Sequence, residues 1–427
     1  MTRTIEVKHL ARVEGHGGIR VVLEGSKIKE LEFDVFEGIR LFEGLVVGRT
    51  ADEIPAIVSR ICAICSHGHT ITALQAIESA LGIKVSPQVR MLRDLAFQGQ
   101  NIESHALHVF ALALPDVLGH ASVVSLASVA PDVVAMALRL KKLGNTVEEA
   151  TGGRAVHPVN HIIGGVGRFP TLDELVAVRR ELEAGIEDCK RAVDVLAGIK
   201  MPDFVHEKIR VAALVPEDEA FFFGDTMALS TGERIPADDY RTLTNERVAL
   251  HSHAKHSVHN GKSYMVGSLA RLTLHGDRIG GMAREAWDRV GMRLPSDNIV
   301  TNNVAQVIEM IYSVEHALKL VNRFLEEGIK PEEPVPYRLH ACKGAAATEV
   351  PRGTLFHSYT LDETGKVVAA DVITPTAQNL LNAEEQMHAT VRDAGGADDA
   401  EIRHRLEIVA RAYDPCISCS VHVLRAD

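Results

Sequence analysis

The chain has 427 residues, of which 46% are hydrophobic and only 4% aromatic, and its formal net charge is −11. This length allows two or three domains with a large core, and the scarcity of aromatic residues favours close helix packing over an all-β sandwich. An acidic chain without a dense Lys/Arg block excludes nucleic acid and an anionic membrane as main partners. The sequence has neither a clean apolar span of about 20 residues nor a signal-peptide core, so we expect a cytoplasmic protein without a membrane span.

The predicted elements are mainly helices, with small β regions. Alternating polar and apolar residues near the N-terminus indicate antiparallel strands, whereas later segments repeat apolar residues every three or four positions, as helices do. In chain order we expect strands within 4–36, a helix opening at Ser86–Pro87, a helix over 171–199 capped by Thr171 and Glu174, a helix over 304–327, a hairpin over 354–373 and a helix over 399–413. The predicted fold class is therefore α+β, mainly α, with a helical-bundle core in a single compact domain.

Four of the six cysteines form two Cys-x-x-Cys pairs, Cys62 with Cys65 and Cys416 with Cys419, and 350 residues lie between the pairs. If the four thiolates met, each pair of charges would repel by ~4 kcal/mol at ~4 Å and an effective dielectric near 20. Cations would have to compensate them, and soft sulfur ligands favour nickel, iron, zinc or copper. Structural zinc sites usually have their cysteine pairs about 15–20 residues apart. The spacing alone leaves a zinc site, a dithiol redox pair and a catalytic metal open.

The residues around these cysteines resemble the large subunit of the nickel–iron hydrogenases. RICAICSHGH at 60–69 is similar to the family's N-terminal cysteine motif, and DPCISCSVH at 414–422 is similar to its C-terminal one. Further family-like stretches follow the family's order: RVEGH at 12–16, FEG at 42–44, GRAVHPVNHIIGGV at 153–166 and VPRG at 350–353. The resemblance covers nearly the whole chain. It implies the hydrogenase large-subunit fold, an oxidoreductase that acts on dihydrogen, and a catalytic metal in place of zinc.

The resemblance implies a nickel–iron centre on the four cysteines. Cys62 and Cys416 would be terminal ligands of nickel, and Cys65 and Cys419 would bridge nickel to an iron that also carries carbon monoxide and cyanide. Dihydrogen would be cleaved heterolytically at this centre. Glu14, in the RVEGH stretch, would take the proton from Cys416, since burial can tune a carboxylate to exchange protons near neutral pH.

Further residues around the centre have implied roles. Arg352, which follows Pro351, would hold its guanidinium over the open metal position, and Asp414 would orient it. An arginine suits this position because carboxylates can hold its planar fork rigidly. His69 would donate a hydrogen bond to a bridging thiolate, as residues behind metal ligands commonly do.

A second metal and a contact to cyanide are implied in the same way. Thr376, which follows Pro375, would donate a hydrogen bond to a cyanide on iron. Glu43 and His422, together with the backbone carbonyl of Val372, would hold a buried magnesium or iron ion.

The electrons must leave through a partner. Cys189, on a helical apolar stripe, and Cys342 are too few for a four-cysteine iron–sulfur cluster, and the sequence has no convincing strand–GxGxxG–helix unit. Clusters and flavin are therefore expected only in partner subunits, of which the nearest would be an iron–sulfur small subunit. Ser104 stands where many respiratory relatives carry Asp. This difference and the CSVH ending resemble the cytoplasmic, bidirectional NAD(P)-linked hydrogenases or sulfhydrogenases, which implies flavin-bearing diaphorase partners in addition.

The resemblance also implies processing of the C-terminus. A maturation protease would remove residues 423–427 once nickel, delivered by a nickel chaperone, is inserted, so that 1–422 form the mature domain. Alternative functions are a cytoplasmic hydrogenase coupled to a deazaflavin or to a heterodisulfide reductase, a zinc-binding scaffold, and a non-catalytic subunit of a respiratory complex. Relatives that serve as respiratory-complex subunits have lost the metal cysteines, whereas this chain retains all four.

Overall fold

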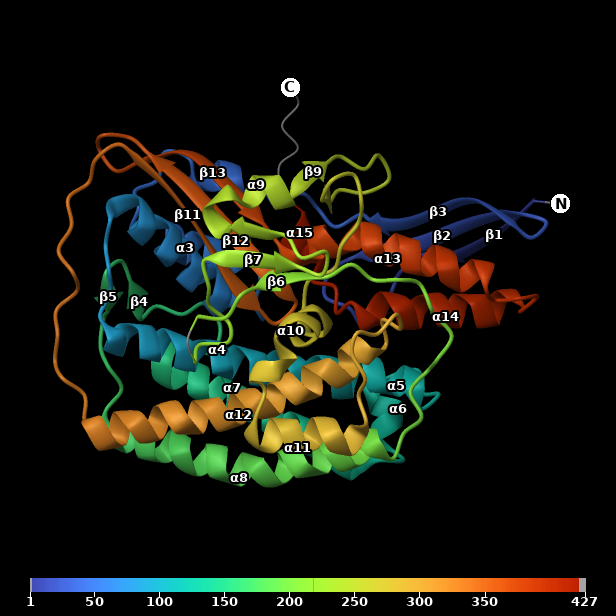
Figure 1. The fold of residues 1–427 in the computed structure, drawn as a ribbon, viewed down its shortest axis with the longest axis horizontal. Helices are drawn as coiled ribbons and strands as arrows, with labels where there is room; N and C mark the ends of the chain where they lie inside the picture. Colours follow the sequence, from blue (N-terminus) through green and yellow to red (C-terminus); the bar gives the residue numbers. More distant parts are fainter. Residues whose placement is uncertain (1, 218, 422–427) are drawn as a thin grey trace.

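Four long helices form the base of the molecule in the computed structural model, which describes residues 2–217 and 219–421 (Figure 1). They are α4 (Pro87–Leu107), α7 (Pro131–Gly152), α8 (Leu172–Ala197) and α12 (Thr301–Glu327), and α4 packs on α7 and α12 while α8 packs on α7 and α12. The short helix α11 (Gly281–Val290) covers α8 and α12. The predicted helical-bundle core is confirmed.

The helices begin where capping residues predict. Thr171 and Glu174 form a reciprocal capping box at the start of α8, and the Ser86 hydroxyl accepts a hydrogen bond from the Val89 N–H at 3.1 Å at the start of α4. Each contact satisfies backbone N–H groups that have no partner within the helix. The predicted helices over 304–327 and 399–413 are likewise confirmed, the latter as α14 (Asp399–Ala412).

The helix that opens at Pro87 continues in a form that the sequence did not predict. After α4 the chain forms a π-helical segment, His108–Ala113, and then the short helix α5 (Leu114–Val117). The wider turn accommodates His108 in the core, where its Nε2 lies 2.8 Å from the carbonyl oxygen of Arg411 and its Nδ1 lies 2.5 Å from Oε1 of Gln306.

The described residues form three three-stranded antiparallel sheets, and the two with the longer strands lie above the helical base (Figure 1). The N-terminal sheet has the order β1 (Thr2–Val7), β2 (Gly17–Glu24) and β3 (Lys27–Val35), as predicted for 4–36. The predicted hairpin over 354–373 is confirmed by β12 (Gly353–Leu361) and β13 (Val367–Ile373), and β11 (Cys342–Val350) adds a third strand that was not predicted. Helix α3 (Ser66–Leu81) packs against β11 and β12, and α13 (Pro375–Arg392) packs against β3 and α14.

The remaining elements are short and connect these layers. They are α1 (Phe42–Val46), α2 (Ile54–Val58), α6 (Val123–Ala127), α9 (Tyr240–Leu243), α10 (Ser268–His275) and α15 (Ile417–Ser420), 3₁₀ turns at Ser59–Ile61, Ala237–Asp239 and Gly276–Arg278, and the strands β4 (His161–Ile162), β5 (Gly165–Val166), β6 (Ala212–Leu214), β7 (Thr226–Leu229), β8 (Arg234–Pro236), β9 (Asn245–Arg247) and β10 (His256–Val258).

The largest apolar cluster lies between the helical base and the layer of α3, β11 and β12. It includes Cys189 and the four cysteines of the two Cys-x-x-Cys pairs, Cys62, Cys65, Cys416 and Cys419, all of them buried. Long helices with small antiparallel sheets confirm the α+β, mainly α fold class. Over residues 2–217 and 219–421, none of the helices combines the length and the apolar character that a bilayer span requires.

Candidate metal centre

The two ends of the chain meet at the four cysteines. Cys62 follows the 3₁₀ turn Ser59–Ile61 and Cys65 immediately precedes α3, whereas Cys416 precedes α15 and Cys419 lies within it. The Sγ atoms of Cys62 and Cys416 are 3.3 Å apart, and those of Cys62, Cys416 and Cys419 all lie within 4.8 Å of one another. The sulfurs of Cys416 and Cys419 are in direct contact with each other.

Cys65 joins this cluster through two contacts. The backbone N–H of Cys65 donates to the Sγ of Cys62 at 3.2 Å, and the Nη1 of Arg352 donates to the Sγ of Cys65 at 3.4 Å. A hydrogen bond between the two side chains, with the Cys65 thiol as donor, outweighs burial and lowers the pKa of the Cys62 thiol. The same side-chain hydrogen bond, together with burial, raises the pKa of the Cys65 thiol well above its ordinary value. Four converging buried sulfurs form a donor set that fits a soft transition metal and does not fit magnesium or calcium.

The carboxylate of Glu14 reaches the cysteine cluster from the N-terminal region. Cys416 Sγ lies 3.2 Å from Oε2 of Glu14, the same oxygen accepts the Ser418 N–H at 3.1 Å, and the Ser418 hydroxyl contacts Oε1. The backbones also pair, because the Ile417 N–H donates to the Glu14 carbonyl at 2.9 Å. Gly15 permits this approach: its φ is +87°, and an added Cβ would lie 2.8 Å from the Cβ of Ile417.

Arg352 and Asp414 form a buried ion pair next to the sulfurs. Nη2 of Arg352 lies 2.9 Å from Oδ1 of Asp414, and Nε donates to the Asp414 carbonyl at 2.8 Å. Gln306 donates to the second carboxylate oxygen at 2.9 Å. Burial alone would lower the pKa of Arg352, but Asp414 and the cysteines outweigh it and raise that pKa above its usual value. The guanidinium is therefore a fixed positive charge against Cys65.

Thr376 and His69 also lie in the buried region around the cysteines. The Thr376 hydroxyl accepts the Cys416 backbone N–H at 3.0 Å, and Pro375 starts the helix that carries Thr376. His69 Nδ1 lies 3.1 Å from Nε2 of His357. Pro351, which directly precedes Arg352, is buried, and its carbonyl accepts a hydrogen bond from the buried side chain of Arg271.

The residues of the second expected metal site are only partly described. The Val372 N–H donates to Oε1 of Glu43 at 2.9 Å, and burial raises the pKa of Glu43 to about 7. Glu43 lines a cavity of about 390 Å³ together with Lys255 and Asp371. His422 lies outside the described residues, as do residues 423–427 of the expected extension.

Several residues at or near the centre were missed by sequence reasoning. Ser418 touches Glu14, Gln306 fixes Asp414, and His357 pairs with His69. Only Ser418 had a signal in the sequence, since it lies inside the second Cys-x-x-Cys motif. Gln306 on α12 and His357 on β12 are far in sequence from the residues that they contact, so no local pattern indicates them.

Within residues 2–217 and 219–421, one other group of potential ligands lies away from these cysteines. His251, His256 and Glu384 offer donor atoms within 4.8 Å of one another. His251 Nε2 already lies 2.7 Å from the carboxylate, and that contact raises the pKa of His251. An ion pair accounts for this arrangement without a metal.

Comparison with known proteins identifies the family. The family model described as nickel-dependent hydrogenase matches residues 40–138 and 217–422. The chain is 36% identical over 423 residues to the alpha chain of sulfhydrogenase 1 of Pyrococcus furiosus, covering 99% of this chain and 98% of that protein. It is 31% identical to a vhu subunit of the F420-non-reducing hydrogenase of Methanocaldococcus jannaschii, covering 89% of this chain and 97% of the relative.

A solved structure agrees with these relatives. A chain of an NAD⁺-reducing [NiFe]-hydrogenase in the H₂-reduced state superposes with a TM-score of 0.87 at 25% identity and covers 98% of this chain and 99% of that one. The expected fold and enzyme class are confirmed. The chain belongs to the nickel-dependent hydrogenase family, as the catalytic large subunit of a [NiFe] hydrogenase.

Proposed function

We propose that this chain catalyses the reversible heterolytic cleavage of dihydrogen at a nickel–iron centre held by Cys62, Cys65, Cys416 and Cys419. The convergence of these sulfurs from both ends of the chain is the observation that carries the proposal. Cys62 and Cys416 would be terminal nickel ligands, and Cys65 and Cys419 would bridge to iron. When bound, nickel and an iron with carbon monoxide and cyanide ligands would supply the Lewis-acid and redox chemistry.

The residues of the chain would then handle the proton. Cys416 is the sulfur next to Glu14, at 3.2 Å, so Cys416 can pass a proton to that carboxylate without a bridging water. Ser418 binds the Glu14 carboxylate through its N–H and its hydroxyl. These two contacts would keep that carboxylate facing the Cys416 sulfur.

Arg352 and Asp414 would act on the open side of the centre. A guanidinium that is buried and tied to a carboxylate cannot swing away, so its positive charge would stabilise negative charge that develops beside Cys65. Thr376 would contact the cyanide on iron, and His69 would contact a bridging thiolate. Pro351 and Pro375 would set the backbone that carries Arg352 and Thr376.

A buried magnesium or iron ion would complete the second site. Glu43 and His422 would supply side-chain ligands and Val372 its carbonyl oxygen. A cation would favour the charged form of Glu43, whose pKa burial raises to about 7. Removal of residues 423–427 by a maturation protease, after a nickel chaperone has delivered nickel, would leave His422 as the last residue of a mature domain over 1–422.

Electrons would pass first to the clusters of an iron–sulfur small subunit, then through flavin-bearing diaphorase partners towards NAD(P). The similarity to the alpha chain of a sulfhydrogenase and to the NAD⁺-reducing structure supports this branch. A hydrogenase that feeds a heterodisulfide reductase is the second candidate, supported by the 31% identity to an F420-non-reducing enzyme.

Purification of the chain with its native partners separates these functions. The proposal predicts hydrogen-dependent reduction of NAD⁺ or NADP⁺ and an iron–sulfur protein in the complex. Hydrogen oxidation with an artificial acceptor but not with either nicotinamide would favour the second candidate. Absence of any hydrogen activity in a complex that contains both metals would contradict both.

A further inference from the structure

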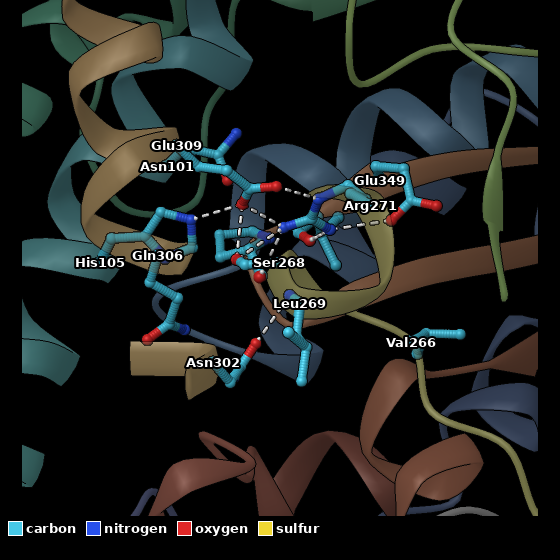
Figure 2. Close-up of polar contacts among 12 residues, drawn as sticks. Asn101, His105, Val266, Ser268, Leu269, Arg271, Asn302, Gln306, Glu309 and Glu349 are labelled. Atoms are coloured by element: carbon cyan, nitrogen blue, oxygen red, sulfur yellow. Dashed lines mark hydrogen bonds and ion pairs between the residues drawn. The ribbon is translucent and has the colours of Figure 1, made fainter. Parts of the chain in front are cut away.

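Arg271 is the centre of a fully buried charged network (Figure 2), and it contacts the turn formed by Pro351 and Arg352. It projects from α10, and its side chain is 1% exposed, while the side chains of its partners Glu309 and Glu349 are 0% exposed. Nε and Nη2 of Arg271 lie 2.7 Å and 2.6 Å from the two oxygens of Glu309, and Nη1 lies 2.8 Å from Oε2 of Glu349. One guanidinium thus joins α12 to β11.

The same guanidinium also holds the backbone directly before Arg352. Nη1 donates to the carbonyl of Val350 at 3.0 Å, and Nη2 donates to the carbonyl of Pro351 at 3.1 Å. With a further contact to the Ser268 hydroxyl at 3.2 Å, every N–H group of Arg271 is directed at an acceptor. A lysine, with three N–H groups around one nitrogen, cannot reach all of these acceptors.

Glu349 fixes the other side of the turn. Its Oε1 accepts the Thr354 hydroxyl at 2.7 Å and the Leu214 N–H at 2.8 Å, so one carboxylate connects the strand before the turn to the strand after it. The backbone of Gly267 closes the remaining side, because an added Cβ there would lie 3.1 Å from the Arg352 carbonyl. The turn is held from several directions by groups that do not touch the cysteines in any described contact.

A role in stability alone accounts poorly for this arrangement. Buried ion pairs cost desolvation that apolar side chains of similar volume avoid, so their net contribution to stability is often small. What such a network supplies is fixed geometry, and the geometry fixed here is that of the two residues preceding Arg352.

We infer that Arg271 is a positioning residue for hydrogen cleavage: by binding the Val350 and Pro351 carbonyls it keeps the Arg352 guanidinium against Cys65 and Asp414. The inference depends on the role proposed above for Arg352. Arg271 itself contacts none of the four cysteines in any described interaction, so it acts through the turn.

The test uses Arg271→Lys in the purified complex, with turnover expressed per nickel. We expect nickel content and the infrared bands of metal-bound carbonyl and cyanide to persist while turnover per nickel falls about 10-fold or more, since displacements near 1 Å can cost up to about 100-fold. Arg93→Lys is the matched control, because Arg93 is equally buried and binds both oxygens of Glu78 at 2.7 Å, away from the turn. It should keep the turnover per nickel of the unmodified enzyme.

A double-mutant cycle with Arg352→Lys decides whether Arg271 acts through Arg352. In the Arg352→Lys background, Arg271→Lys should cause less than about a 2-fold further loss. Losses that multiply, or a turnover per nickel that is unchanged in Arg271→Lys, would overturn the inference. If Arg271→Lys does not fold, Glu349→Gln serves in the same cycle with the same expectations. Full turnover in Arg352→Lys alone would instead refute the proposed role of Arg352, whatever Arg271→Lys does.

Discussion

The sulfur of Cys416 lies 3.2 Å from a carboxylate oxygen of Glu14, although 402 positions separate the two residues in the chain. This contact brings the RVEGH stretch near the N-terminus against the C-terminal cysteine motif, and Cys416 is one of the proposed nickel ligands. The proposed first acceptor of a proton released at the cysteine cluster is therefore Glu14.

Glu14→Gln should abolish most turnover while leaving the metals bound. The amide preserves the shape of the side chain and can still accept the Ser418 N–H, but it cannot take up a proton at neutral pH. We expect a loss of about 10²–10⁴-fold in hydrogen–deuterium exchange, the usual contribution of a positioned acid–base group. Glu24→Gln, at an exposed residue of β2, should exchange normally. Near-normal exchange in Glu14→Gln would remove Glu14 from the proton path.

Gly15→Ala should separate Glu14 from Cys416. Alanine at a φ of +87° is strained, and its Cβ would lie 2.9 Å from the Ser418 backbone nitrogen. Strain costs about 1–2 kcal/mol, and the clash about 1–3 kcal/mol more. Gly25→Ala has a similar φ of +62° with nothing within 4 Å, so it carries the strain without the clash. Hydrogen–deuterium exchange should fall only in Gly15→Ala, and an equal fall in both variants would show that the close approach is unimportant.

Glu309 should make stability sensitive to acid. Burial alone would raise the pKa of Glu309, but Arg271 and His105 outweigh it and lower the pKa to about 2, against an ordinary value of 4.5. The unfolded chain therefore binds more protons between these two values, and the stabilisation present above about pH 4.5 is lost as the pH falls towards 2.

Glu309→Gln tests this dependence through denaturant midpoints measured at about pH 7 and at about pH 3. The variant should lose about 3–5 kcal/mol near neutral pH, because Arg271 keeps only one carboxylate partner, and it should lose less than the unmodified chain on acidification. Equal acid sensitivity in the two proteins would contradict the assignment.

Replacing a proposed ligand cysteine should remove nickel, whereas replacing a cysteine outside the proposed metal site should not. Cys62→Ser replaces a soft thiolate by a hard hydroxyl, so nickel retention should fall close to zero. Cys342→Ser, at a half-buried position at the start of β11, should retain nickel and turnover. Nickel analysis of the two purified variants checks this, and full nickel in Cys62→Ser would exclude that residue as a ligand.

Local signals in the sequence predicted the helices and the N-terminal sheet. The capping box at Thr171 and the Ser86–Pro87 start lie where α8 and α4 begin, because caps are set by neighbouring residues. The π-helical segment and β11 were missed, since both depend on long-range contacts such as His108 with Arg411.

The candidate site followed from the resemblance and not from local pattern. The cysteine motifs, Glu14 and Arg352 are recognisable in the sequence, and the structure places them together. Arg271 was not predicted, because in LARLTLH it has the pattern of an ordinary helix residue. Its partners Glu309 and Glu349 lie 38 and 78 positions away, on a different helix and on a strand.

Metal analysis of the purified complex, combined with infrared spectroscopy, tests the central claim most directly. The account predicts nickel in the complex and infrared bands of carbonyl and cyanide bound to metal. Zinc in place of nickel, without those bands, would contradict it.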